Sequence, residues 1–92
     1  MNFDLQLFAE EDLQKQSSKS IKKGIRSLKK VIAIHQAKIL NPESFYPNEW
    51  NNLKEEEKKG NFKHWQKEIE NAKKSINNRI EELRKRGEEI DE

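Results

Sequence analysis

Two histidines and a run of three acids are the residues most able to do direct chemistry in this chain. A lone imidazole needs a nucleophile or a carboxylate beside it, and His35 has neither at helical spacing. The consecutive acids at 55–57 point around a helix rather than toward one point, which predicts a solvated surface. There is no cysteine, so disulfides, thiolate metal sites and thiol catalysis are excluded. We therefore expect no enzymatic activity, no cofactor and no metal site.

Basic residues are the next candidates, because they could contact phosphates. The segment from Leu13 to Leu40 holds eight basic residues and no acid. We define the basic stripe as six of them: Lys19, Lys22, Lys23, Arg26, Lys29 and Lys30. The stripe has one arginine and no interleaved aromatic residue. Because acids of the second half should lie across from it (Glu68, Glu70, Glu81 and Glu82), internal or partner-facing salt bridges are favoured over nucleic-acid binding.

Aromatic residues crowd the segment 41–50, which reads NPESFYPNEW. A merely flexible loop would not hold three of them, so we expect them to form a small satellite core with residues of the flanking helices. In that core we place Leu40, Phe45, Tyr46, Trp50, Phe62 and Trp65. His64 is expected beside the seam, the line along which two long helices described below should meet. It should lie about a turn and a half from His35, which argues against a two-histidine metal site. The candidate partner-binding residues at this end are Phe45, Tyr46, Trp50, His64 and Trp65.

Two long helices must position these residues. The first is expected from the serines at 17–20 to Leu40, and its apolar positions recur every three or four residues: Ile21, Ile25, Leu28, Ile32, His35 and Ile39. Pro42 should end it. The second is expected from Asn61 to Arg86, with Gly87 as its stop and this apolar stripe: Phe62, Trp65, Ile69, Ala72, Ile76, Ile80 and Leu83. A short helix at 49–58 is expected between them, with a break or kink at Gly60.

A compact connection makes two such helices antiparallel. The residue numbers of facing pairs then add up to 104, as in Ile21 with Leu83, Leu28 with Ile76 and Ile39 with Trp65. The fold predicted is all-α, an antiparallel, coiled-coil-like hairpin of two long helices with an aromatic loop packed over its tip. Gly24 on the flank of the stripe would let another chain segment approach closely. A lone hairpin is marginal in stability, so we expect self-association or a larger partner.

The two ends of the chain lie outside this hairpin domain, which we place at 17–87. Residues 1–16 are expected to form a flexible arm and residues 88–92 an acidic tail. The arm is interpreted either as loosely docked or as a docking peptide whose apolar side chains fit another protein: Phe3, Leu5, Leu7 and Phe8. No apolar run approaches the roughly 18 residues of a membrane span, and no secretory signal precedes the helices.

Two stretches resemble known phage proteins. Leu5-Gln6-Leu7-Phe8-Ala9 resembles the leader that begins many capsid and scaffold-type proteins of tailed phages of Gram-positive hosts. The segment from about 20 to 76 resembles a helical module of phage minor head proteins. The residues that match are Ser27-Leu28, Ile34-His35, Lys38-Ile39, Asn41-Pro42-Glu43, Phe45 or Tyr46, His64-Trp65 and Glu68-Ile69. The resemblance implies a phage or prophage origin, a role in virion assembly, and a location in the host cytoplasm or the virion.

Three functions are open at this point. The first is a phage structural or assembly protein that binds another virion protein or itself in the head region. The second is a phage-encoded regulator or inhibitor of a host or defence protein. The third is nucleic-acid binding through the basic stripe.

Overall fold

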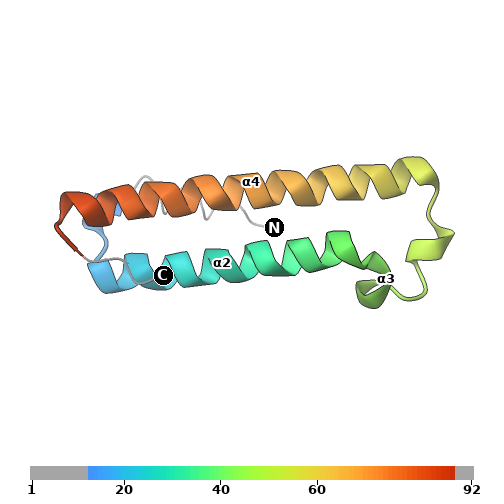
Figure 1. Ribbon diagram of the computed structural model, residues 1–92, viewed down its shortest axis with the longest axis horizontal. Coiled ribbons are helices and arrows are strands. Elements are labelled where there is room, and N and C mark those ends of the chain that lie inside the picture. The colour runs from blue at the N-terminus through green and yellow to red at the C-terminus, as the bar shows by residue number, and fades with distance from the viewer. Residues whose placement is uncertain (1–12, 89–92) are drawn as a thin grey trace.

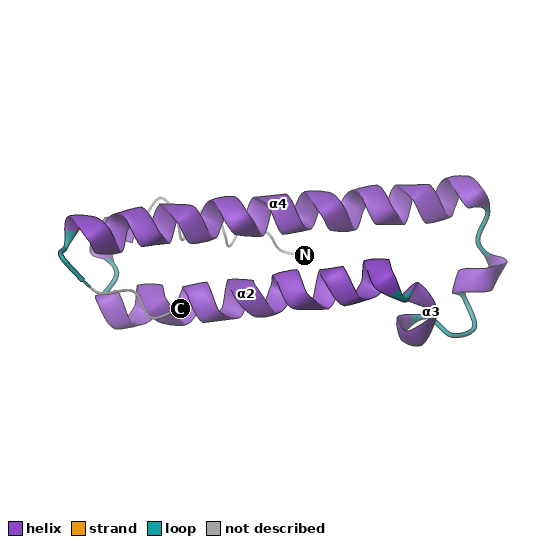
Figure 2. Cartoon of the chain, viewed as in Figure 1, coloured by secondary structure: helices purple, strands orange, loops and turns teal. Residues whose placement is uncertain are grey.

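The computed structural model describes residues 13–88 as two long antiparallel helices lying side by side (Figure 1). The first, α2, spans Ser18–Leu40, and the second, α4, spans Glu55–Lys85. Between them lie a short helix, α3 (Pro42–Phe45), and a 3-10 turn, η2 (Trp50–Asn52); another 3-10 turn, η1 (Leu13–Lys15), precedes α2. All regular structure in residues 13–88 is helical (Figure 2). The predicted all-α hairpin with an aromatic loop at its tip is confirmed.

Both limits of α2 follow from local sequence. Ser17 is the N-cap, and its hydroxyl accepts a hydrogen bond from the Ser20 N–H at 3.1 Å, which satisfies one of the free donors of the first turn. At the other end, Asn41 precedes proline and leaves helical geometry. Pro42 then opens α3, where its missing N–H costs nothing.

The start of α4 differs from the prediction. No separate helix spans 49–58, and Gly60 neither breaks nor kinks the chain, since α4 runs without interruption from Glu55. The Lys54 N–H donates to Glu57 Oε1 at 2.9 Å, and three acids in the first turn favour the positive end of the helix dipole. Gly60 costs a helix only about 1 kcal/mol, which these interactions offset. The acids at 55–57 are exposed, as expected, but they also begin this helix.

The end of α4 is the glycine stop that the sequence predicts. Gly87 has a φ of +74°, in the left-handed region that suits a residue without a Cβ. Its N–H donates to the Arg84 carbonyl at 2.9 Å, and the Glu88 N–H donates to the Leu83 carbonyl at 3.0 Å. This pair of bonds is the Schellman motif, which satisfies two carbonyls of the last turn.

The core lies between the two helices and extends to the turn before α2. Its buried members are Leu13, Ile21, Ile25, Leu28, Ala72, Ile76 and Leu83, with Ile32 and Ile80 packed against them. Arg79 is buried as well, with 5% of its surface exposed, whereas Ile80 is only half-buried. The Nη1 of Arg86 donates to the Ser18 hydroxyl at 3.2 Å. This bond joins the C-terminal end of α4 to the first turn of α2.

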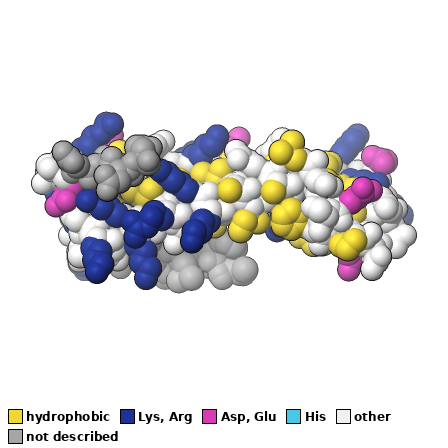
Figure 3. Space-filling view, turned by 60° about the horizontal axis from the view of Figure 1, so that its bottom comes forward, with side chains coloured by type: hydrophobic (Ala, Val, Ile, Leu, Met, Phe, Trp, Pro, Cys, Tyr) yellow, Lys and Arg dark blue, Asp and Glu magenta, His cyan; other side chains and the backbone are white. Residues whose placement is uncertain are grey.

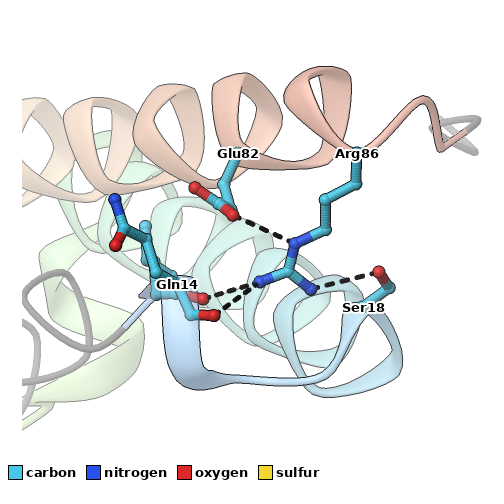
Figure 4. A network of polar contacts seen from close by, with 5 residues as sticks. Gln14, Ser18, Glu82 and Arg86 are labelled. Atoms are coloured by element: carbon cyan, nitrogen blue, oxygen red, sulfur yellow. Dashed lines mark hydrogen bonds and ion pairs between the residues drawn. The ribbon is translucent and has the colours of Figure 1, made fainter.

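Residues 13–16, which the prediction assigned to the flexible arm, are part of the folded hairpin instead. Leu13 is buried, and residues 13–16 form a turn that packs on the open end of the hairpin. Arg86 holds this turn by donating to the carbonyls of Leu13 at 2.8 Å and Gln14 at 3.5 Å (Figure 4). Its Nε donates to Glu82 at 3.0 Å. One guanidinium therefore joins η1, α2 and α4.

Within residues 13–88, neither long helix combines the length and the apolar character that crossing a membrane requires.

Candidate functional site

Four aromatic side chains meet at the connected end of the hairpin, and we call them the aromatic cluster: Tyr46, Trp50, Phe62 and Trp65. Trp65 is its centre. The ring centroid of Trp65 lies 5.9 Å from that of Trp50, 5.7 Å from that of Phe62 and 6.3 Å from that of Tyr46. Trp50 and Phe62 meet edge to face at 5.4 Å. These offset and edge-to-face arrangements are the favourable ones for aromatic pairs, so the cluster is a packed unit.

Consecutive turns bring the cluster together. The Tyr46 N–H donates to the Pro42 carbonyl, the Trp50 N–H to the Tyr46 carbonyl and the Leu53 N–H to the Trp50 carbonyl, at 3.0 to 3.1 Å. The Asn52 side-chain amide donates to the Asn48 carbonyl at 3.0 Å. This chain of turns carries Tyr46 and Trp50 back over α4, where Phe62 and Trp65 lie one turn apart. Trp50 and Trp65 are both buried as a result.

Two lysines lie over the cluster and were not predicted. The Nζ of Lys38 is 5.9 Å from the ring centroids of Phe45, Tyr46 and Trp65, and the Nζ of Lys58 is 5.7 Å from that of Trp50. Such ammonium groups are attracted to aromatic faces. The spacing of Lys58, four residues before Phe62, is a signal that could have placed it near this cluster. Lys38 precedes Ile39, which the predicted register pairs with Trp65, so the register is the signal that could have placed it there.

Two apolar residues predicted in the satellite core lie outside it. Leu40 is 85% exposed and Phe45 is 41% exposed. Leu40 follows Ile39, which continues the seam, and one residue rotates a helix by about 100°, so Leu40 points away from α4. Phe45 instead lies on the outside of α3, beside Lys38. The connected end of the hairpin thus presents two large apolar side chains to solvent.

The two histidines lie in different surroundings. His35 is half-buried, and its Nδ1 lies 2.8 Å from the Val31 carbonyl oxygen, which confirms a histidine at the edge of the core with one satisfied nitrogen. His64 is exposed on α4, one residue before Trp65, so its side chain is accessible to a partner. No group of three metal-ligating side chains occurs in the part of the chain that the structure describes.

A hollow opens beside the aromatic cluster. Its volume is about 190 Å³, and its lining consists of Tyr46, Glu49, Trp50, Leu53, Asn61 and Trp65. Three of these side chains are aromatic, one is a carboxylate, and none is basic. The sequence placed the three rings together but did not predict the hollow, whose lining depends on the turns that carry residues 46–53 to α4.

The basic stripe lies at the opposite end of the molecule, on the first half of α2 (Figure 3). All six side chains are exposed or half-buried. Lys22 Nζ pairs with Glu88 at 3.6 Å. Two of the acids expected across the seam pair with arginines three or four residues along the chain, Glu81 with Arg84 at 3.4 Å and Glu82 with Arg86 at 3.0 Å. Lys22 thus forms an internal salt bridge, but with Glu88, which follows the end of α4.

The candidate docking residues of the arm, Phe3, Leu5, Leu7 and Phe8, lie outside the described residues. Comparison of the chain with protein-family models, with curated proteins and with solved structures finds no match.

Proposed function

We propose that this chain is a protein-interaction module whose connected end binds another protein. The observation that carries the proposal is the exposure of Leu40 and Phe45 next to a packed aromatic cluster. Aromatic residues are enriched at the centres of protein interfaces, where fixed rings bind at a low cost in side-chain entropy. Because the cluster is already packed, little ordering is needed when a partner arrives.

The resemblance to phage minor head proteins and to capsid-type leaders supports a place for this module in virion assembly. The partner is then another structural protein of the head region or a second copy of this chain. A regulator that binds a host or defence protein uses the same surface. The identity of the captured protein separates these two roles.

The test is site-specific crosslinking with matched positions. A photoreactive phenylalanine analogue replaces Phe45, and in a control it replaces Asn77, which is exposed in the second half of α4. We expect a defined protein adduct from position 45 and a much weaker one from position 77. Equal adducts from both positions would contradict the proposal. An adduct between two copies, together with a mass in solution above the 11.0 kDa of one chain, would identify the partner as this protein itself.

The basic stripe supports a second candidate function, the binding of a nucleic acid. Its side chains gather on one part of the surface, as the space-filling view shows (Figure 3). Affinity that rests on phosphate contacts falls steeply with salt. Filter binding of duplex and single-stranded DNA and RNA across a salt series tests it. Absence of binding at low salt would exclude this function.

A further inference from the structure

We infer that the hollow beside the aromatic cluster is a pocket for an arginine side chain of the partner protein. This inference rests on the proposed protein-binding role of the connected end and names the chemistry of the group that is bound. The hollow measures about 190 Å³, whereas pockets for drug-sized ligands run from about 300 to 1,000 Å³. Its size therefore suits one side chain rather than a nucleotide or a large cofactor.

The walls of the hollow favour a cation. Tyr46, Trp50 and Trp65 line it with aromatic rings, whose faces carry partial negative charge. Glu49 adds a full negative charge, and its carboxylate takes part in no ion pair within residues 13–88. A partner cation would thus meet an unneutralised carboxylate beside three rings.

The cluster already attracts cations of this chain, but those lie elsewhere on it. Lys38 and Lys58 are 5.7 to 5.9 Å from ring centroids of the cluster, yet neither lysine lines the hollow. The ammonium of Lys58 is also within 3.8 Å of Glu55, which neutralises part of its charge. The hollow therefore remains open to a positive group from outside.

The ring geometry favours a guanidinium over an ammonium. The rings of Tyr46 and Trp65 are parallel to within 3°, with centroids 6.3 Å apart. A planar guanidinium can contact aromatic rings and still donate hydrogen bonds in its own plane to acceptors of the same lining, which an ammonium cannot do. Glu49 and the side-chain oxygen of Asn61 are acceptors in the same lining.

The test uses an arginine analogue and its neutral counterpart. The probes are N-acetyl-arginine methylamide and N-acetyl-citrulline methylamide, which have nearly the same shape but differ in charge. The two indole N–H signals in nitrogen–proton NMR spectra report on the hollow, because the chain has two tryptophans and both line it. Ionic strength is held constant with sodium chloride.

We expect the arginine analogue to shift both indole signals and to bind about tenfold more tightly than the citrulline analogue. Glu49→Gln should abolish most of this preference. Glu56→Gln, which removes an exposed carboxylate outside the hollow, should preserve it. Indole signals that match the wild type before titration show that each variant is folded. Equal binding of the two analogues, no shift with either, or an unchanged preference in Glu49→Gln would each overturn the inference.

This experiment is independent of the partner. If crosslinking at position 45 fails while the arginine analogue binds selectively, the proposed function falls and the pocket stands. If crosslinking succeeds while the analogues bind equally, the pocket assignment falls and the protein-binding role stands.

Discussion

Gly24 of α2 and Arg79 of α4 lie against each other in the seam, where most contacts are between apolar side chains. Arg79 is 5% exposed, and its Nη1 donates to the Ser75 carbonyl one turn earlier at 3.0 Å. A Cβ on Gly24 would lie 3.0 Å from Arg79 Nε. The glycine expected to admit a close neighbour therefore admits the guanidinium stem of a buried arginine.

The two helical glycines should respond differently to alanine. Alanine is preferred to glycine inside a helix by about 1 kcal/mol. Gly60→Ala should raise the free energy of unfolding by about that amount, because nothing lies within 4 Å of its added Cβ. Gly24→Ala should give no gain or a loss, since the added methyl group contacts Arg79. Urea denaturation followed by circular dichroism measures both changes.

A double-mutant cycle provides the control for this prediction. In an Arg79→Ala background the contact is gone, so Gly24→Ala should recover most of the gain seen at Gly60. If Gly24→Ala stabilises the wild-type protein as much as Gly60→Ala does, the close packing of Gly24 against Arg79 has no energetic consequence.

The elements are held in place by a few specific groups at their ends. Ser17 begins α2 through its hydroxyl, whereas Ser20 contributes its backbone N–H to the same bond. Ser17→Ala should therefore lower the free energy of unfolding by about 1 kcal/mol, and Ser20→Ala should change it by a few tenths at most. Thermal unfolding of the two variants side by side measures this. Equal losses of stability in Ser17→Ala and Ser20→Ala would contradict the prediction that the Ser17 hydroxyl is the group that caps α2.

Arg86 fixes η1 to the hairpin, as Ser17 fixes the start of α2 (Figure 4). Arg86→Ala removes charge-assisted bonds to Glu82, Ser18 and two carbonyls of η1, so we expect a loss of about 2 kcal/mol. Arg86→Lys should recover only part of it, because an ammonium cannot reproduce the planar fork. Arg84→Ala is the matched control, since Arg84 is well exposed and should cost under about 0.5 kcal/mol. A loss at Arg84 as large as at Arg86 would contradict the prediction.

The whole molecule has two different ends, joined by the seam. One end has the basic stripe and the turn fixed by Arg86, and the other has the aromatic cluster with the exposed Leu40 and Phe45. The seam between them is mostly structural, so we expect substitutions at the aromatic end to change binding with little effect on stability where the side chain is exposed. Leu40 is the clearest such position.

The first residues of the chain give a further prediction about how the whole molecule binds its partner. If residues 1–9 are a docking peptide, their deletion should weaken capture of the partner found by crosslinking, because four large apolar side chains are lost: Phe3, Leu5, Leu7 and Phe8. The deletion should leave the circular dichroism of the hairpin unchanged. Quantitative pull-down with the full chain and the deletion variant measures the effect. Equal capture would exclude the docking role of the arm.

Much of the fold could be predicted because its signals are local. Ser17, Pro42 and Gly87 mark helix limits through interactions within a few residues, and the spacing of apolar residues sets the two faces that meet. The same spacing carried information that the prediction did not use. Strict alternation of three and four residues from Ile69 leads to Ala72, Ile76 and then position 79, so the periodic position is arginine rather than Ile80.

The sequence by itself thus determined two antiparallel helices, their facing stripes and the gathering of aromatic residues at the connection. Only the tertiary structure decided which residues at that connection are buried. The exposure of Phe45 and the hollow beside Glu49 depend on where a series of turns places side chains against a helix far away in the chain. The continuity of α4 through Gly60, by contrast, follows from local interactions in the first turn of the helix, which offset the cost of one glycine, about 1 kcal/mol.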